Sequence, residues 1–455
     1  MQDLTKGSIT RHLLGMAAFI GIGLVFQTAY FLVDLFFVSR LGKDAVAGVS
    51  GAGTATFLIL ASSQIIAVGC LSLVSQATGR KDVDDANLVF NQALALGLAA
   101  GVAALFLFYG LADPAMHGLA AAPEAGTFGT RYLYGFAPSL AIMFPTAALG
   151  AGLRGTGVVR PTMLVQTVSV LLNVVLAPVL IAGWATGRPL GTLGAGLASS
   201  AAALVGLVIL YAITPRVQQF LRVQPALMRP RMAVWRRIVA IGLPSAGEFF
   251  LMFVIIGIVY WAIRRFGPEA QAGYGIGARI MQSIFLPAMA VSFAAAPIAG
   301  QNFGARQPER VRRTFIQAAL IGGSIMLALT MLCRWRPAML VEPFTTDPAV
   351  MAVATGYLGV ISWNFVASGL VFTCSAVFQG MGNTWPSLAS SATRLVTFAV
   401  PAIWLARTPE ATLDQFWLIS VASVALQAVL SVALVFREFR RRLTPLETAA
   451  APAIS

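Results

Sequence analysis

Charged residues are scarce in this chain. They make up 11% of its 455 residues, whereas a soluble protein carries about a quarter. Cysteine and histidine are scarcer still. The three cysteines show no paired spacing, which argues against a disulfide framework or a metal site. The chain has two histidines, His12 and His117, which are too few for a typical His-based metal or catalytic site. No loop is long enough for a soluble catalytic domain, so we expect neither an enzyme nor a cofactor.

Hydrophobic residues are abundant instead and make up 58% of the chain. They form continuous runs rather than alternating at period two, which predicts an all-α integral membrane protein and disfavours a β-barrel. Each run reaches the ~20 residues needed to cross a hydrocarbon core about 30 Å thick. The sequence predicts twelve transmembrane spans, at residues 14–38, 45–69, 88–110, 130–152, 161–183, 192–214, 238–263, 270–298, 314–334, 350–378, 386–406 and 414–437.

A basic stretch with six arginines, residues 215–237, separates two halves of the chain. Short sequence motifs of the first half recur in the second at one constant spacing. For example, Arg40-Leu41-Gly42 is answered by Arg265-Phe266-Gly267. We call the spacing from Arg40 to Arg265 the repeat offset. One register that holds across separate segments indicates two homologous halves. Each half has an even number of spans, so we expect two parallel six-helix repeats. The predicted parts are an N-lobe at 1–214, a linker at 215–237, a C-lobe at 238–437 and a tail at 438–455.

Lysine and arginine set the expected orientation. Loops on the side of the termini hold twenty of them, and loops on the opposite side hold nine. The positive-inside rule then places both termini and the linker in the cytoplasm, in a multi-pass protein of the plasma (inner) membrane. The net charge of +14 is explained by these loops, so no nucleic-acid partner is expected. A monomer surrounded by lipid is the expected state.

Four ionisable residues fall inside predicted spans, where each costs at least about 2.5–3.5 kcal/mol. One of them, Asp34, lies ~9 Å from the outer end of the first span. Tyr30 is on the same helix face, and Asn173 lies in the outer half of the fifth span. These three could meet and hold a proton or a Na⁺ ion. The alternative is an Asp near the membrane surface that is satisfied by water.

The other three are Glu248, Arg279 and Arg394. Glu248 and Arg279 lie at similar depths, ~15 and ~14 Å. They could form a structural ion pair, which is cheaper than either charge alone, or Glu248 could exchange a proton. Arg394 lies ~12 Å into its span from the cytoplasmic side, where we favour a side chain that snorkels to the surface over one that meets substrate.

A third polar group lies in the tenth predicted span. Trp363 and Asn364, with Ser368 one turn later, could line a central substrate cavity together with Arg279 and Arg394. Ordinary core packing is the alternative for the tryptophan.

The order of short motifs in both halves resembles the multidrug and toxic compound extrusion (MATE) transporters. The resemblance covers nearly the whole chain and rests on Leu41-Gly42, Ala45, Ala47-Gly48, Gln76-Ala77, Gly79, Leu153-Arg154-Gly155-Thr156-Gly157 and Pro161 in the first half, and on Gly300-Gln301-Asn302-Phe303-Gly304-Ala305 and Phe378-Gln379-Gly380-Met381-Gly382-Asn383 in the second. It implies an alternating-access antiporter that expels amphipathic, often cationic, compounds in exchange for H⁺ or Na⁺.

The resemblance also implies where the coupling ion binds. In the DinF-like branch an Asp of the first span and an Asn of the fifth form the N-lobe site, which Asp34, Tyr30 and Asn173 match. That branch has a second Asp four residues after the Asn, where this chain has Ala177. This loss weakens the case for Na⁺ at the N-lobe site.

In the NorM-like branch a Glu of the seventh span and an Asp of the tenth serve the C-lobe. Glu248 matches the Glu, but Ser368 stands at the position of the Asp. The main hypothesis is therefore a proton-coupled antiporter with Asp34 as principal coupling carboxylate and Glu248 as a second site. The alternatives are a Na⁺-coupled antiporter and a lipid-linked oligosaccharide flippase, for which Arg279 and Arg394 would meet phosphates.

Overall fold

The computed structural model describes residues 3–119, 123–184, 187–218 and 221–446. At residues 31, 32, 34, 35, 54, 55 and 119 it describes the backbone alone. Within these ranges the chain is helical, and twelve helices are long and apolar enough to cross a membrane. The predicted all-α fold with twelve spans is confirmed.

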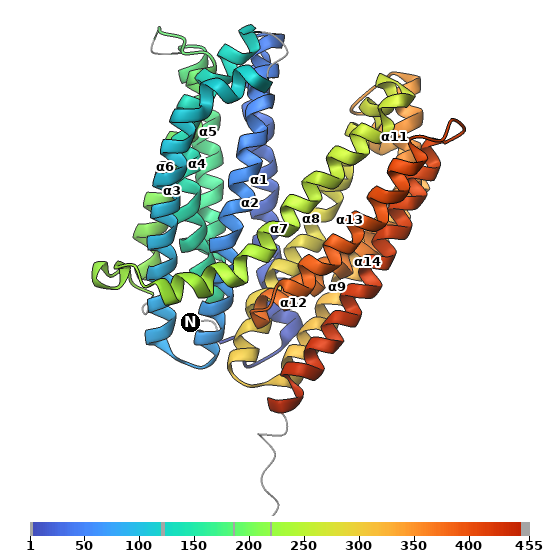
Figure 1. The fold of residues 1–455 in the computed structure, drawn as a ribbon. Helices are drawn as coiled ribbons and strands as arrows, with labels where there is room; N and C mark the ends of the chain where they lie inside the picture. Colours follow the sequence, from blue (N-terminus) through green and yellow to red (C-terminus); the bar gives the residue numbers. More distant parts are fainter. Residues whose placement is uncertain (1–2, 120–122, 185–186, 219–220, 447–455) are drawn as a thin grey trace, which may run out of the picture. The chain divides into compact units, whose positions relative to one another are not determined.

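Most helices of the first half continue well past the ends of the predicted spans (Figure 1). Their bounds are α1 Ile9–Ser39, α2 Lys43–Gly79, α3 Val83–Leu119, α4 Pro123–Gly155, α5 Arg160–Ile181 and α6 Thr192–Val217. The second half contains α7 Met232–Ile263, α8 Pro268–Gly304, α9 Pro308–Trp335, α10 Pro337–Val341, α11 Pro348–Ile361, α12 Asn364–Met381, α13 Trp385–Leu405 and α14 Leu413–Arg442, with the 3-10 turns η1 Pro225–Met228 and η2 Arg264–Phe266.

The repeat offset returns in the backbone. The starts of α2, α3, α4 and α5 reappear at that offset as the starts of α8, α9, α11 and α13. The two non-glycine residues with positive φ, Lys81 at 61° and Arg306 at 56°, are also related by it. So are Gly157 and Gly382, at 84° and 75°, a left-handed conformation that favours glycine at the end of a helix. The two halves therefore share helix ends and turn geometry as well as sequence motifs.

Packing divides the chain into two units, and the division differs from the predicted lobes. The first unit comprises residues 1–3 and 22–246, and the second comprises 4–21 and 247–455. Helices α1 and α7 thus each contribute to both units, and their crossing points, 21/22 and 246/247, are again related by the repeat offset. The linker and the first half of α7 belong with the first unit because α7 packs there: a Cβ at Gly242 would overlap the Ile65 carbonyl of α2.

Helix α4 is the centre of the first unit and contacts α2, α3 and α6. Glycines allow the close approach: Gly48 of α2 lies against the Ala125 carbonyl of α4, and Gly196 of α6 against the Tyr132 carbonyl. Close packing through small residues is the usual way for membrane helices to associate.

The basic linker lies on the first unit, held by three amide side chains of α3. Asn87 accepts from the Arg222 backbone N–H, Asn91 accepts from that of Gln224 at 2.7 Å, and Gln92 accepts from that of Arg231 at 2.8 Å. The second unit holds the N-terminal segment in a related way. Gln317, the counterpart of Gln92 at the repeat offset, accepts from the Thr10 hydroxyl at 3.0 Å.

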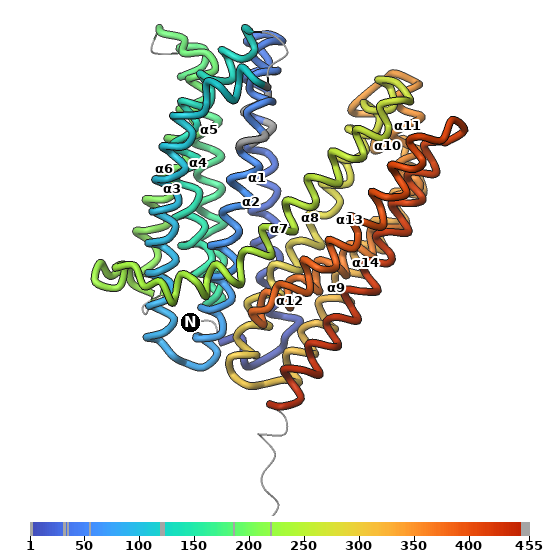
Figure 2. The backbone as a smooth tube through the Cα atoms, in the orientation of Figure 1, coloured from blue at the N-terminus to red at the C-terminus, as the bar shows by residue number. Residues whose placement is uncertain are grey.

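The tenth predicted span is not one helix. It is broken at Ser362 and Trp363 into α11 and α12, and Figure 2 draws α11 beside the short helix α10. Trp363 is 59% exposed at this break, and the Arg334 guanidinium lies 4.8 Å from its ring centroid. Both junction residues keep right-handed helical dihedrals. Apolar composition alone predicted the span but does not record this local break in the helix.

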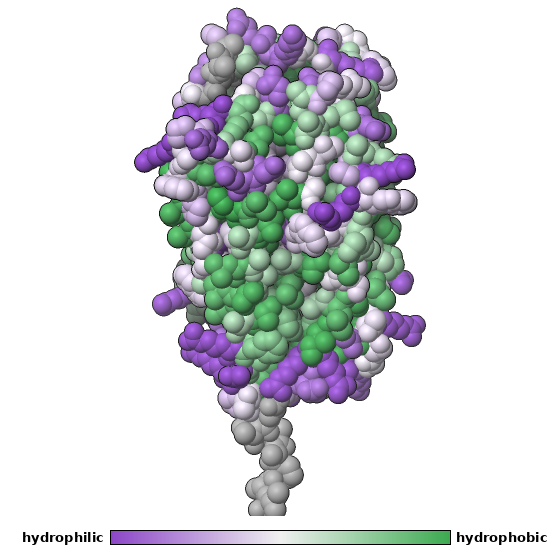
Figure 3. Space-filling view, turned by 90° about the vertical axis from the view of Figure 1, so that its right-hand side faces the viewer, coloured by the Kyte–Doolittle hydropathy of each residue, from purple (hydrophilic) through white to green (hydrophobic). Residues whose placement is uncertain are grey.

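The surface of the second unit fits a lipid environment. On the face in Figure 3, hydrophobic side chains cover the lower middle, while hydrophilic ones gather at the two ends and also occur in the upper half. Exposed apolar residues include Leu426 and Val429 of α14 and Val396 and Val400 of α13. Such side chains belong next to hydrocarbon rather than water.

Candidate functional site

The first unit has a polar cluster around Asn173 of α5, which is fully buried. Its amide nitrogen donates to the Ser199 hydroxyl of α6 at 3.2 Å and lies 3.5 Å from the Tyr30 hydroxyl of α1. Its carbonyl oxygen is buried and has no hydrogen-bond partner among the described residues. The structure therefore brings Tyr30 and Asn173 together, as predicted, and leaves an acceptor available in the cluster.

Asp34 lies one turn after Tyr30 on α1. Its side chain lies outside what the structure describes, so its predicted meeting with Tyr30 and Asn173 stays a prediction. The helical spacing puts residues 30 and 34 on one face of α1.

The second unit places Glu248 of α7 among hydroxyl groups. Ser375 of α12 donates to the carboxylate, at 3.1 Å to Oε2 and 3.5 Å to Oε1. Ser387 of α13 is its second hydrogen-bonding partner. No ion pair of Glu248 occurs among the described residues. Three helices of one unit thus build a carboxylate site whose neutral partners can serve either protonation state.

Arg279 is not the partner of Glu248. It is an exposed residue of α8, and its side chain has no ion pair among the described residues. The structural ion pair considered from their similar depths is therefore absent. Depth along a helix does not fix the face on which a side chain lies.

Arg394 of α13 lies beside an aromatic group of the second unit. The phenols of Tyr357 and Tyr274 are the titratable groups that interact with it electrostatically. Its Nε is buried and has no hydrogen-bond partner. Tyr274 and Tyr357 belong to α8 and α11 of the second unit. Whether the guanidinium snorkels to the cytoplasmic surface stays a prediction.

The other predicted cavity residues lie at or after the helix break. Asn364, the first residue of α12, is 4% exposed, and its side-chain carbonyl is buried without a partner. Ser368 is half-buried one turn later. Whether Trp363, Asn364 and Ser368 contact substrate stays a prediction.

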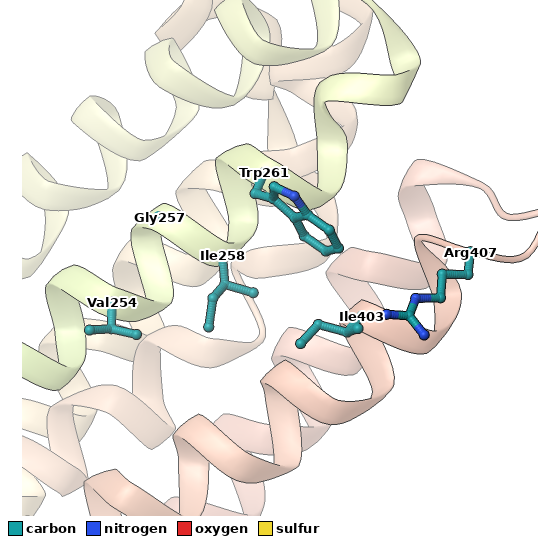
Figure 4. Close-up of a pocket in the computed structure, with 6 residues that line it drawn as sticks. All are labelled: Val254, Gly257, Ile258, Trp261, Ile403 and Arg407. Atoms are coloured by element: carbon teal, nitrogen blue, oxygen red, sulfur yellow. The ribbon is translucent and has the colours of Figure 1, made fainter.

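A cavity of about 430 Å³ opens between α7 and α13 of the second unit. Figure 4 shows its lining, in which Ile403 and Arg407 lie side by side across from Val254, Ile258 and Trp261. Ile403 and Arg407 come from α13 or its end, and Val254, Gly257, Ile258 and Trp261 from α7. None of the predicted site residues lines it, so it is separate from the Glu248 site.

Sequence reasoning missed the hydroxyls. Ser199, Ser375 and Ser387 contact the predicted residues, but a serine inside an apolar helix gives little signal. One sequence signal could have indicated them: in α13 the serines at 387, 390 and 391 lie on one side of the helix. No group of three or more His, Cys, Asp or Glu that could hold a metal ion occurs in the described part of the chain.

Twelve membrane-spanning helices in two related halves, with buried polar clusters inside each unit, define a polytopic membrane transporter. The chain belongs to the MatE family, that of the MATE transporters: the family model matches residues 20–179 and 244–405. The two matched regions cover both halves, in agreement with the resemblance found in the motifs.

Curated relatives match over most of their length. The chain is 27% identical over 391 residues to "Probable multidrug resistance protein NorM" of Bradyrhizobium diazoefficiens, covering 83% of this chain and 82% of that protein. It is 26% identical to "FAD transporter" of Shewanella oneidensis, covering 88% of each. It is 24% identical to "Multidrug export protein MepA" of Staphylococcus aureus, covering 83% of each.

Solved structures share the fold. A transporter of the MOP superfamily from Pyrococcus furiosus, described by a reverse polarity of its binding pocket, matches with a TM-score of 0.88 at 22% identity, over 98% of this chain and 99% of that one. The outward-facing conformation of a multidrug resistance MATE transporter matches with a TM-score of 0.88 at 23% identity, over 98% and 99%. At these identities the likeness shows the fold alone.

Proposed function

We propose that this protein is a secondary antiporter of the plasma (inner) membrane that exports amphipathic, often cationic, compounds in exchange for protons by alternating access. Both termini lie in the cytoplasm, as the distribution of Lys and Arg favours. The export of drug-like compounds is supported by the names of the relatives, two of which are a multidrug resistance protein and a multidrug export protein.

The observation that carries the proton proposal is the environment of Glu248. A carboxylate inside a membrane span is expensive and usually marks an ion pathway. Here it has hydroxyl partners and no cation among the described residues, and its side chain is half-buried, so part of it stays accessible. An Arg or Lys partner would hold the carboxylate in its charged form, whereas hydroxyls permit a proton to bind and leave.

The N-lobe would supply the principal coupling site, at Asp34. Asn173, Tyr30 and Ser199 provide neutral groups of both donor and acceptor type next to the same helix face. Na⁺ coupling is the competing mechanism. Ala177, which has no side-chain oxygen, stands where a second carboxylate would assist Na⁺, and this favours the proton because hard cations need several oxygen ligands.

The test is uptake of a fluorescent cationic dye by inverted membrane vesicles, driven separately by a pH gradient and by a Na⁺ gradient. We expect the pH gradient to drive uptake and Asp34→Asn and Glu248→Gln each to abolish or strongly reduce it. Glu410→Gln, which neutralises an exposed carboxylate near the end of α13, is the matched control and should behave as wild type. Uptake driven by Na⁺ alone, or full proton-driven uptake in Asp34→Asn, would contradict the proposal.

A further inference from the structure

Arg394 is a half-buried charge whose Nε is buried without a hydrogen-bond partner. All of residues 247–446, which include every C-terminal helix from α8 onward, are described, and no ion pair or side-chain hydrogen bond of Arg394 occurs among the described residues. It is the tenth residue of the 21-residue helix α13 and so lies near the middle of a span. A guanidinium in such a place ordinarily pairs with an anion or a ring of acceptors.

The aromatic group beside Arg394 does not supply that anion. The rings of Tyr274, Tyr357 and Trp417 contact one another, with centroids 5.3 Å apart for Tyr274 and Tyr357 and 4.8 Å apart for Tyr357 and Trp417. All three residues are at most 5% exposed. They form a rigid wall next to the arginine, and the two phenols near it are hydrogen-bonding groups rather than permanent charges.

Glu248 does not supply it either. Ser387, the partner of Glu248 on α13, precedes Arg394 by seven residues. Two helical turns put both residues on one side of α13, with ~10 Å between them along the axis. The acidic and the basic site of the second unit are therefore distinct positions along one helix stripe.

Arg394 is also reachable. The residue is half-buried, so part of it is accessible, while its Nε is sealed. A guanidinium offers five donors in a planar fork that matches a carboxylate or a phosphate. We propose that Arg394 binds the carboxylate or phosphate of an exported organic anion or zwitterion, with the hydroxyls of Tyr274 and Tyr357 near enough to assist.

This inference adds organic anions to the cations that the proposed antiporter would export. It rests on the proposed function only in treating the bound anion as an exported substrate. The binding step can be tested alone. The probes are fluorescein, an organic anion, and rhodamine 6G, a cation with the same xanthene skeleton. Binding of each to the purified full-length protein in phosphatidylcholine nanodiscs is measured by fluorescence polarisation.

We expect wild type to bind fluorescein and Arg394→Gln to bind it at least tenfold more weakly, since a charge-assisted bidentate contact is lost. Arg394→Lys should keep part of the affinity because the charge remains without the fork. Rhodamine 6G binding should be unchanged or stronger in Arg394→Gln. Arg437→Gln, which removes an exposed charge from the end of α14, controls for net charge and should match wild type with both probes.

Thermal unfolding guards against a folding artefact. Fluorescein should raise the unfolding temperature of wild type and not that of Arg394→Gln, and without ligand the variant should be at least as stable as wild type, because an unpaired buried charge has been removed. If Arg394→Gln does not fold, Tyr357→Phe, which keeps the ring and deletes the hydroxyl, should weaken fluorescein binding about two- to fivefold. Fluorescein affinity within twofold of wild type in Arg394→Gln, or no fluorescein binding by wild type, would overturn the inference.

Two further experiments are needed. One distinguishes a lipid headgroup from a soluble anion, and the other distinguishes the anion site from the antiporter proposal. If nanodiscs with phosphatidylglycerol suppress fluorescein binding at equal lipid content, the anionic group that binds is a lipid headgroup; without such suppression it is that of a soluble compound. Proton-driven dye uptake that fails while Arg394-dependent binding persists would refute the antiporter and leave the anion site. Intact proton-driven uptake without Arg394-dependent binding would refute the anion site and leave the antiporter.

Discussion

The two halves of this transporter repeat their packing but not their polar residues. Gly48 lies against the Ala125 carbonyl in the first unit, and Gly273 lies near the Val350 carbonyl in the second. Both glycines, and likewise both carbonyls, are related by the repeat offset. The backbone contacts that hold the helices together have thus been kept in both copies.

The polar clusters are not repeated between the two halves. At the same offset, Asn173 of the first unit corresponds to Phe398 of the second, which is 2% exposed in an apolar core. Glu248 corresponds to Gly23, and Arg394 corresponds to Ser169. A duplicated helix scaffold fixes where helices approach one another, but each lobe carries its own polar chemistry. The first lobe offers an amide and hydroxyl cluster, and the second offers a carboxylate and, farther along α13, an unpaired arginine.

Among residues whose side chains the structure describes, the largest effect should come from neutralising the carboxylate of the second lobe, Glu248. In Glu248→Gln we expect the initial rate of proton-driven dye uptake in inverted vesicles to fall at least tenfold, because the amide cannot release and rebind a proton. Ser375→Ala should lower it only about fivefold, since one neutral hydrogen bond contributes about 1 kcal/mol. Equal effects of the two substitutions would mean that hydroxyl packing, rather than proton exchange, is what matters at this site.

Packing of α7 should differ between the two units to which it contributes. Gly242→Ala introduces a methyl group that overlaps the Ile65 carbonyl, and overpacking costs about 1–3 kcal/mol. The apparent unfolding temperature should fall. Gly257→Ala, on the same helix but with no atom within 4 Å of the added Cβ, should leave it unchanged or raise it, as alanine favours helix. Similar stability of the two variants would contradict the crossover of α7 into the first unit.

The amide cluster of the first lobe should have a smaller effect than Glu248. Asn173→Ala removes the group that joins Tyr30 and Ser199, at about 1 kcal/mol, which is roughly a fivefold lower rate of proton-driven uptake. Ser199→Ala should change the rate by no more than twofold to threefold. An Asn173→Ala rate equal to that of wild type would remove Asn173 from the coupling site.

The smallest effect concerns the linker that precedes α7 and the first turn of α1. Gln92 makes hydrogen bonds with the backbone at Leu227, Arg229 and Arg231 of the linker, whereas Gln317 accepts one from Thr10. Gln92→Ala should therefore speed tryptic cleavage of the linker severalfold, with transport nearly intact. Gln317→Ala, the repeat-equivalent variant, should leave linker cleavage at the wild-type rate. Equal cleavage in wild type and Gln92→Ala would show that the amide does not restrain the linker.

The sequence by itself determined the class of protein, the twelve spans and the duplication. Hydrophobic length and the recurrence of glycine-rich motifs are local properties, and a membrane leaves helices as nearly the only way to satisfy the backbone of such runs. Even positive-φ residues such as Lys81 and Arg306 repeat at the offset that the motifs indicated.

The tertiary structure alone decided which polar groups meet. Asn173 and Tyr30 were paired correctly from depth, and the family resemblance supplied the same two helices. Glu248 was considered as a partner of Arg279 from depth, yet its contacts are Ser375 and Ser387. Depth is a coordinate along one helix, whereas a contact also requires the rotation of two helices about their axes and the choice of neighbours. Both are set by close packing across the whole lobe, for which a stretch of apolar sequence carries little information.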